Sequence, residues 1–326
     1  MRMVSGLVAL VVIAAAAPAM AQTTACVLAS GDSAAVKQYW PLPLQVVNTS
    51  DRRCTQLPFG QVSCHLSGWL YTPGGAVGKR PTIVHQHGSG QTPAEACRYI
   101  KYFLARDFVV FTPLLRGTSD SNGAFSNSGM FMDDYKTMRS NQWLAAHPGQ
   151  TTVPSDVKEG FEIDYLEEEV AETRAALKYV DTLANVDEAR IAITGHSFGG
   201  SQTMFASNEV LSPQPVVAVN LSGGVLSWSQ DPWEARLTAA APLHRIPILF
   251  LQTVNEGPAS APIDPMVKLF TAAQGAGKPE AVVSIFSLVE GATQGQDAHT
   301  QFFKNNDQVN RWAPVVAEFL ARYGLE

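Results

Sequence analysis

The segment that most constrains the fold is Gly195–Gly199, which reads Gly-His-Ser-Phe-Gly and fits the pattern G-x-S-x-G. A strand-forming run, Arg190–Thr194, leads into it, and a helix-forming run, Phe198–Ser207, follows it. A serine in this setting is typical of a sharp strand-to-helix turn that strains the serine backbone and exposes its hydroxyl. The alternative is a Gly/Ser loop that only turns the chain. We predict a strand, a tight turn and a helix, with Ser197 as a nucleophile at the turn.

Apolar runs that suit strands alternate with amphipathic stretches that suit helices along most of the chain. We expect strands at residues 62–71, 81–87, 108–115, 191–194, 216–221, 246–251 and 281–288. We expect helices at residues 94–106, 162–183, 198–207 and 310–323. This alternation predicts the α/β class, with a mostly parallel, doubly wound sheet and helices on both faces.

The N-terminus carries the pattern of a secretory signal peptide. Arg2 precedes the apolar run Val4–Ala17, and small residues surround a cleavage position after Ala21. A membrane anchor is the alternative, but the run is shorter than the roughly 20 residues that span a bilayer. We therefore expect residues 1–21 to be removed and the protein to be exported, periplasmic or secreted, with no stable membrane insertion.

The remaining residues, 22–326, suit one large α/β domain. The segment Gly123–Asp156 interrupts the alternation, and its length and aromatic content fit either an ordinary excursion or a lid or pocket wall. The net charge of −6 is scattered and forms no basic stripe, so we expect no nucleic-acid partner.

The chain has four cysteines, Cys26, Cys54, Cys64 and Cys97. In an oxidising compartment an even number favours two disulfides, for which three pairings exist. We favour Cys54–Cys64, across a short loop, with Cys26–Cys97 as the second bond. The alternatives are four free thiols, or a lipidated Cys26.

A nucleophilic serine needs a general base, and the order along such a chain is serine, acid, histidine. The two histidines that follow Ser197 in the sequence are His244 and His299. His244 precedes the strand that begins at Ile246, at the wrong end of the sheet. His299 follows the last strand, in the predicted loop Gly291–Thr300. We predict that His299 is the base.

The acid must orient the histidine and stabilise its cation. Glu256 lies in the loop after the strand at residues 246–251, and catalytic groups gather at the carboxyl ends of strands in open α/β sheets. We therefore predict Glu256 as the acid. Asp264, Asp231 and Asn255 remain alternatives.

The oxyanion of an acyl-transfer intermediate needs backbone N–H donors. One is expected from Phe198, directly after the nucleophile, and the other from Ser89 in the loop after an early strand. His85 and His87 alternate on that strand, but no third metal ligand accompanies them in the sequence. We expect neither a metal nor another cofactor.

Several segments, in this order, resemble the dienelactone hydrolase family and the catalytic domain of prolyl oligopeptidase-like serine hydrolases, from about Gly68 onward. They are Gly68–Pro73, His87–Gly90, Arg116-Gly117, Gly195–Gly200, Phe250–Gln252 and His299. The resemblance implies the α/β-hydrolase fold and a hydrolytic activity. This chain differs in having Ser197 where dienelactone hydrolases use cysteine, Glu256 where the family's acid is usually Asp, and no room for a propeller.

Together these patterns predict an exported serine hydrolase that cleaves small carboxylic esters through Ser197, His299 and Glu256. A peptidase or amidase with the same three residues, an acyltransferase, and a hydrolase-like binding protein without turnover are the alternatives.

Overall fold

A computed structural model describes residues 26, 28, 33–41, 54–56, 62–75, 77–89, 95–114, 132–229, 231–257, 262–275, 277–287 and 292–326. The predicted signal peptide, residues 1–21, lies outside these ranges, as do Gly90, Arg116 and residues 123–131 of the predicted insertion. No helix in the described ranges is both long enough and apolar enough to cross a bilayer.

Nine strands of the described chain form one sheet in the order β1-β3-β5-β4-β6-β7-β8-β9, with β2 paired to β3. The strands are β1 (Ser33–Pro41), β2 (Cys54–Gln56), β3 (Val62–Thr72), β4 (Arg80–Gln86), β5 (Val109–Pro113), β6 (Val186–His196), β7 (Val217–Leu221), β8 (Ile248–Thr253) and β9 (Ala281–Phe286). From β5 to β9 neighbouring strands are parallel, whereas β1, β2 and β3 pair antiparallel.

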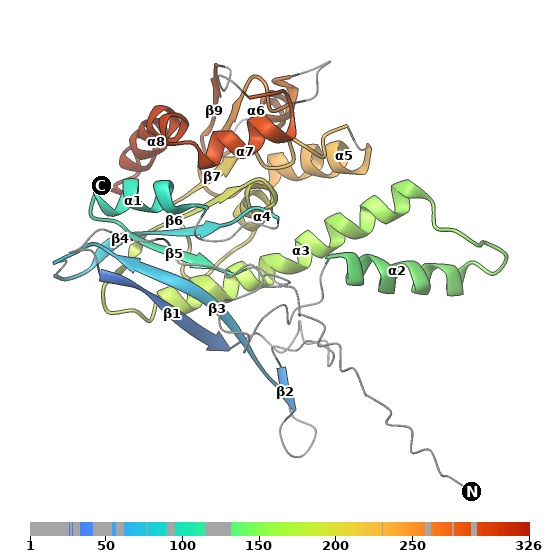
Figure 1. Ribbon diagram of the computed structural model, residues 1–326, viewed down its shortest axis with the longest axis horizontal. Helices are drawn as coiled ribbons and strands as arrows, with labels where there is room; N and C mark the ends of the chain where they lie inside the picture. The colour runs from blue at the N-terminus through green and yellow to red at the C-terminus, as the bar shows by residue number, and fades with distance from the viewer. Residues whose placement is uncertain are drawn as a thin grey trace, which may run out of the picture.

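Helices cover both faces of this sheet (Figure 1). They are α1 (Cys97–Leu104), α2 (Met132–Ala146), α3 (Ser155–Val180), α4 (Phe198–Ser207), α5 (Asp231–Ala240), α6 (Asp264–Ala273), α7 (Gln296–Lys304) and α8 (Asn306–Ala321), with a 3₁₀ turn, η3, at Ala241–Leu243. Residues of α3, α4, α5 and α6 share one apolar core, and residues of α1, α7 and α8 share a second. The predicted α/β class and doubly wound sheet are therefore confirmed.

All seven predicted strands and all four predicted helices are present, although α3 begins seven residues before the expected Glu162. One prediction about the site was wrong: His299 lies in α7 and not in a loop. The local sequence accounts for the start of this helix. Gly295, with a φ of 82°, lies immediately before it, and the carboxylate of Asp297 in its first turn interacts favourably with the helix dipole. Such a short helix needs tertiary packing, which Phe302 and Phe303 supply.

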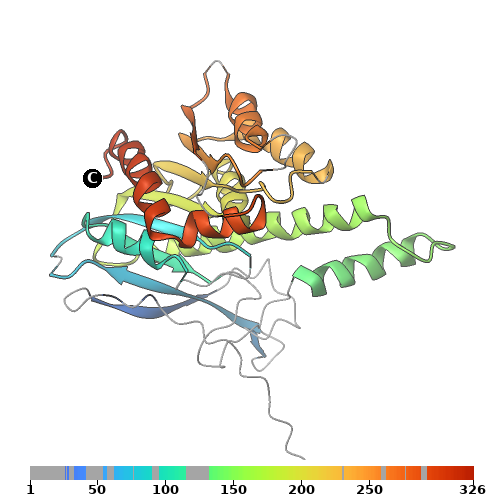
Figure 2. The same cartoon turned by 45° about the horizontal axis from the view of Figure 1, so that its top comes forward.

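A helical hairpin, α2 with the first half of α3, projects from the body in both views (Figures 1 and 2). Tyr135, Val153, Phe161 and Tyr165 form a small apolar cluster between its two helices, against which Phe198 packs. The described part of the predicted insertion is therefore largely this hairpin.

The predicted disulfide between Cys26 and Cys97 is present, and it attaches the start of the described chain to α1. In the antiparallel pairing of β2 with β3, Cys54 and Cys64 are direct Cα partners. Cross-strand partners lie at separations that a disulfide can bridge. Their side chains lie outside the described part of the structure, so this second bond stays a prediction.

Candidate active site

Ser197 lies in the turn between β6 and α4, as the sequence predicts. Its backbone has φ 57° and ψ −121°, a conformation that costs energy for any residue with a side chain. The backbone N–H of Ser197 donates to the carbonyl of Leu221 on β7, at 2.9 Å, which fixes the turn to the sheet. The strained serine thus stands at the carboxyl edge of the central strands, at the N-terminus of a helix.

Two glycines allow this turn to close. A Cβ atom at Gly195 would overlap the carbonyl oxygen of Gly199. A Cβ atom at Gly199 would overlap the backbone carbonyls of Gln86 and His87 at the end of β4. The first turn of α4 therefore packs directly on the backbone that leads to Ser89.

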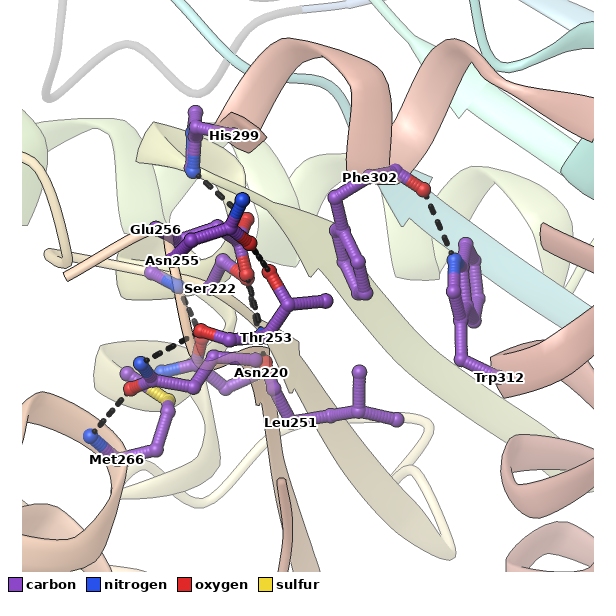
Figure 3. Close-up of polar contacts among 12 residues, drawn as sticks. Asn220, Ser222, Leu251, Thr253, Asn255, Glu256, Met266, His299, Phe302 and Trp312 are labelled. Carbon is purple, nitrogen blue, oxygen red and sulfur yellow. Dashed lines mark hydrogen bonds and ion pairs between the residues drawn. The ribbon is translucent and has the colours of Figure 1, made fainter. Parts of the chain in front are cut away.

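His299 and Glu256 form a buried pair at the same edge of the sheet. Figure 3 shows Nδ1 of His299 directed at Oε1 of Glu256, with 3.1 Å between the two atoms. The side chains are 3% and 0% exposed. Because a carboxylate oxygen only accepts, Nδ1 of His299 is the donor in this bond, and in the neutral ring the lone pair is then on Nε2. Nε2 is buried and has no hydrogen-bond partner in the structure, which leaves it available to a reacting group.

The second oxygen of Glu256 is held by two further donors. Ser222 donates its hydroxyl to Oε2 at 2.9 Å, and the backbone N–H of Thr253 donates to the same oxygen at 2.6 Å (Figure 3). In addition, the N–H of Gly295 donates to the carbonyl of Asn255 at 2.8 Å and joins this loop to the start of α7. The carboxylate is thus fixed before any substrate binds.

His196, which precedes the nucleophile, packs on the predicted base. The rings of His196 and His299 are stacked with centroids 4.6 Å apart. Burial holds the pKa of His196 well below its usual value, so its ring is neutral and adds no charge beside the base. The stack connects the nucleophile segment with α7.

Ligand atoms of His196, Glu256 and His299 lie within 4.8 Å of one another, a spacing that a metal ion can bridge. However, both oxygens of Glu256 and Nδ1 of His299 already take part in hydrogen bonds. Hydrogen bonding accounts for the arrangement of this cluster.

A pocket of about 310 Å³ opens beside the nucleophile. Ser89, Ser197 and Phe198 line it, so the structure brings the nucleophile and both predicted oxyanion donors to one cavity. Glu162 of α3 also lines it, whereas none of the described residues 132–156 does. The insertion reaches the pocket only indirectly, because Lys136 of α2 pairs with Glu162 at 3.4 Å.

The other residues that the sequence offered as base or acid have structural contacts or positions instead. Both ring nitrogens of His244 contact backbone carbonyls, those of Ile246 at 3.0 Å and Ala273 at 3.2 Å. Asp264 begins α6 and pairs with Lys268, 3.6 Å away. Asp231 also begins a helix, α5.

Three residues near the site were not found from the sequence. Ser222 holds Glu256, and Ser201 and Trp233 line the pocket. For Ser222 a signal existed, since it directly follows β7 at the catalytic edge of the sheet. Nothing in the sequence pattern distinguishes Ser201 or Trp233 from ordinary core residues.

A strained serine at a strand-to-helix turn and a buried histidine–carboxylate pair, on a doubly wound sheet, define a serine hydrolase of the α/β-hydrolase fold. The chain belongs to the acetyl xylan esterase (AXE1) family, whose model matches residues 46–220. It is therefore a serine-type carboxylic ester hydrolase. The matched region includes Ser197 and Ser89, while Glu256 and His299 lie beyond it.

Solved structures share the fold. Esterase 2 of Thermogutta terrifontis, phosphoramylated by tabun, superposes with a TM-score of 0.51 and 17% identity, covering 80% of this chain and 90% of that one. The acylaminoacyl peptidase of Pyrococcus horikoshii superposes with a TM-score of 0.53 and 15% identity, over 89% of this chain. A puromycin-hydrolyzing peptidase of Mycobacterium tuberculosis superposes with a TM-score of 0.53 and 19% identity, over 84% of this chain. This chain spans 42% and 40% of those two peptidases. No curated protein sequence matches it.

Proposed function

We propose that this protein is an exported esterase that hydrolyses small carboxylic esters through Ser197, His299 and Glu256. The observation that carries the proposal is the buried bond from His299 Nδ1 to Glu256, which leaves Nε2 unpartnered at the edge of the sheet where Ser197 stands. A base fixed in this tautomer is what a serine nucleophile requires.

In the first half of the reaction His299 takes the hydroxyl proton of Ser197 as the serine oxygen attacks the ester carbonyl. The N–H groups of Ser89 and Phe198 stabilise the oxyanion, helped by the N-terminus of α4. His299 then protonates the departing alcohol, and Glu256 stabilises the imidazolium while it exists. In the second half water, activated by His299, releases the acid from Ser197.

Family membership favours acetyl esters of hydroxyl-rich alcohols as substrates, since the family is that of acetyl xylan esterases. The first test is hydrolysis of p-nitrophenyl acetate by the wild type, by Ser197→Ala and by Ser207→Ala. Ser207 is the control, because it lies at the far end of the same helix and its hydroxyl bonds only locally, to Met204 and Asn208. We expect turnover in the wild type and in Ser207→Ala. Normal turnover by Ser197→Ala would refute the proposal.

The amidase alternative makes a different prediction with the same enzyme. Cleavage of p-nitroanilide peptides, with poor turnover of every ester, would replace the esterase proposal. A fluorophosphonate probe that labels the wild type but not Ser197→Ala would show a reactive serine, whether the enzyme is an esterase or an amidase. Such labelling would also exclude a binding protein without turnover.

Export is supported by the disulfide between Cys26 and Cys97, because disulfides persist in oxidising compartments. Expression of the full chain in a Gram-negative host, followed by fractionation and N-terminal sequencing, tests it. We expect a mature periplasmic protein that begins at Gln22. An uncleaved cytosolic chain would contradict export.

A further inference from the structure

A single hydrogen bond does not fix the orientation of the predicted base. The bond from Nδ1 of His299 to Oε1 of Glu256 holds one ring atom, 3.1 Å from its partner. The last side-chain torsion of histidine is broad, so the ring can still tilt about this bond and redirect Nε2. A displacement of about 1 Å in a reacting group can cost about 100-fold in rate. The plane of the His299 ring therefore needs a second contact, on its face.

His196 supplies a contact of this kind. Its ring lies on the ring of His299, with centroids 4.6 Å apart and 24° between the two planes. A hydrogen bond also joins the ring of His196 to the backbone of His299. His196 is the last residue of β6, and Ser197 directly follows it. The face contact thus places the base relative to the segment that carries the nucleophile.

The ring of His196 is itself firmly held. It is 0% exposed, and Phe303 of α7 stacks on it with centroids 4.4 Å apart and 9° between the planes. Burial holds the pKa of His196 well below its usual value, so the ring is neutral. A neutral ring does not oppose the charge that His299 gains when it takes a proton, whereas a second imidazolium would.

We propose that His196 is a positioning residue for the base, and that the face of its ring sets the plane of His299 and the direction of Nε2. The inference rests on the proposed ester hydrolysis. Glu256 then fixes which nitrogen of His299 carries the proton, and His196 fixes where the other nitrogen points. His196 is not among the described residues that line the pocket beside Ser197, so it acts through His299 and not on the substrate.

Two substitutions test whether the flat ring is the feature that matters. His196→Leu removes the ring, and we expect kcat for p-nitrophenyl acetate to fall by about 30- to 100-fold, with KM within about threefold of the wild type. His196→Phe keeps a flat ring and loses only the nitrogens, so we expect kcat within about fivefold of the wild type. Rates are expressed per active site, counted by titration with a fluorophosphonate probe, so that unfolded protein does not lower them.

The same two substitutions at His85 are the matched control. His85 is also 0% exposed, and it stacks on Phe303 with centroids 5.4 Å apart, so Phe303 and His196 separate it from His299. His85→Leu and His85→Phe should both keep kcat within about threefold of the wild type, whatever they do to stability.

Phe303→Leu is the second route to the same answer if His196→Leu does not fold. It leaves both histidines in place and removes a ring that packs on His196. We expect kcat to fall severalfold with KM unchanged. Full activity per active site in Phe303→Leu, when His196→Leu does not fold, would overturn the inference.

Failure of the inference differs from failure of the proposed function. A wild-type kcat in His196→Leu overturns the inference, because the ring is then not needed. An equal loss in His196→Phe and His196→Leu, or in His85→Leu, overturns it too. If the wild type cleaves no ester, the proposed function fails, and the rate at which the fluorophosphonate labels Ser197 gives the same comparison among the variants.

Discussion

Glu256 is held in place by donors from three different elements. Its carboxylate receives His299 from α7, Ser222 from the turn after β7, and the N–H of Thr253 from the end of β8. Because Oε2 of Glu256 accepts from the N–H of Thr253, three residues earlier, the glutamate side chain folds back over its own turn. The extra methylene of glutamate, compared with aspartate, spans this turn. This geometry brings the carboxylate of Glu256 to His299 from a loop that immediately follows β8.

Glu256→Gln should therefore reduce kcat strongly. A glutamine presents one oxygen and one NH₂, so its NH₂ must face either His299 or the two donors at Oε2. The unfavourable contact misorients the base, and replacing a triad carboxylate by its amide costs about 10⁴-fold in kcat. Steady-state hydrolysis of p-nitrophenyl acetate measures it. Glu234→Gln is the control, since this carboxylate pairs with Lys268, 2.9 Å away and outside the site. A loss below about tenfold in Glu256→Gln would remove Glu256 from the mechanism.

Ser222→Ala removes the hydroxyl that bonds Oε2 of Glu256 at 2.9 Å and also contacts the carbonyl of Leu251 at 3.3 Å. Since Thr253 and His299 still hold the carboxylate, we expect kcat to fall by about tenfold, the value of one hydrogen bond to a charged group, with KM unchanged. The pH profile of kcat/KM should shift as well, because the charge balance between carboxylate and imidazole changes. An unchanged kcat and profile would show that Ser222 serves only the fold, and Ser207→Ala provides the comparison.

Residues with a chemical signature could be predicted from the sequence, whereas residues defined only by contacts could not. The glycines around Ser197 are required by close backbone approach, and His299 follows from the order of elements along the chain. Glu256 was predicted from its place after a strand, and the structure pairs it with His299. Trp233 and Ser201, by contrast, become part of a pocket only because α5 folds against α4.

At the scale of elements, continuity of apolar residues decided what could be predicted. Strands such as β7 and β8 are buried on both faces and are mostly apolar, with Asn220 as the polar residue in β7 and Gln252 and Thr253 at the end of β8. The helices α2, α5, α6 and α7 were not predicted. Prolines stand in the first turns of α5 and α6, and α7 is only nine residues long. Tertiary packing, which the local sequence does not contain, stabilises these short helices.

The disulfide between Cys26 and Cys97 attaches the N-terminal segment to α1, across 71 residues of sequence. Closing a loop of that length removes chain entropy from the unfolded state, for which about 4 kcal/mol is the expected scale. Replacing both cysteines with serine should therefore lower the free energy of unfolding by about 2–4 kcal/mol. Urea unfolding followed by circular dichroism measures the change.

The Cys54→Ser, Cys64→Ser double variant serves as the matched control for this loop-length argument. Its predicted loop is much shorter, so its loss should be smaller by about 1–2 kcal/mol. Peptide mapping of the unreduced protein must show both pairs. An equal loss in the two double variants would contradict the entropic explanation.

At the scale of the whole molecule, a row of stacked rings joins the sheet to the active site. His85 stacks on Phe303, Phe303 on His196, and His196 on His299, with centroids 5.4, 4.4 and 4.6 Å apart. The row runs from the centre of the sheet to α7, between the apolar core and the polar site. Burial lowers the pKa of its two inner histidines, His85 and His196, so both rings are neutral.

His85 of this row, together with His87 just after β4, makes the folded state sensitive to acid. Burial lowers the pKa of His85 to about 3 and that of His87 to about 4, from the usual 6.5. Below pH 6.5 the unfolded chain takes up protons at these positions and the folded protein does not, so stability falls as the pH falls. Each histidine should cost about 2 kcal/mol of unfolding free energy between pH 7 and pH 5.

Urea unfolding at both pH values measures this loss in the wild type, in His85→Asn and in His87→Asn, with His147→Asn as the exposed control. Carboxylates contribute equally to all four proteins, so the differences isolate the histidines. Each buried variant should lose about 2 kcal/mol less than the wild type on acidification, whatever its stability at pH 7, and the His147 variant should match the wild type. If all four proteins lose the same amount, then the buried rings take up protons in the folded state as they do in the unfolded chain, and the neutral row beneath His299 does not exist.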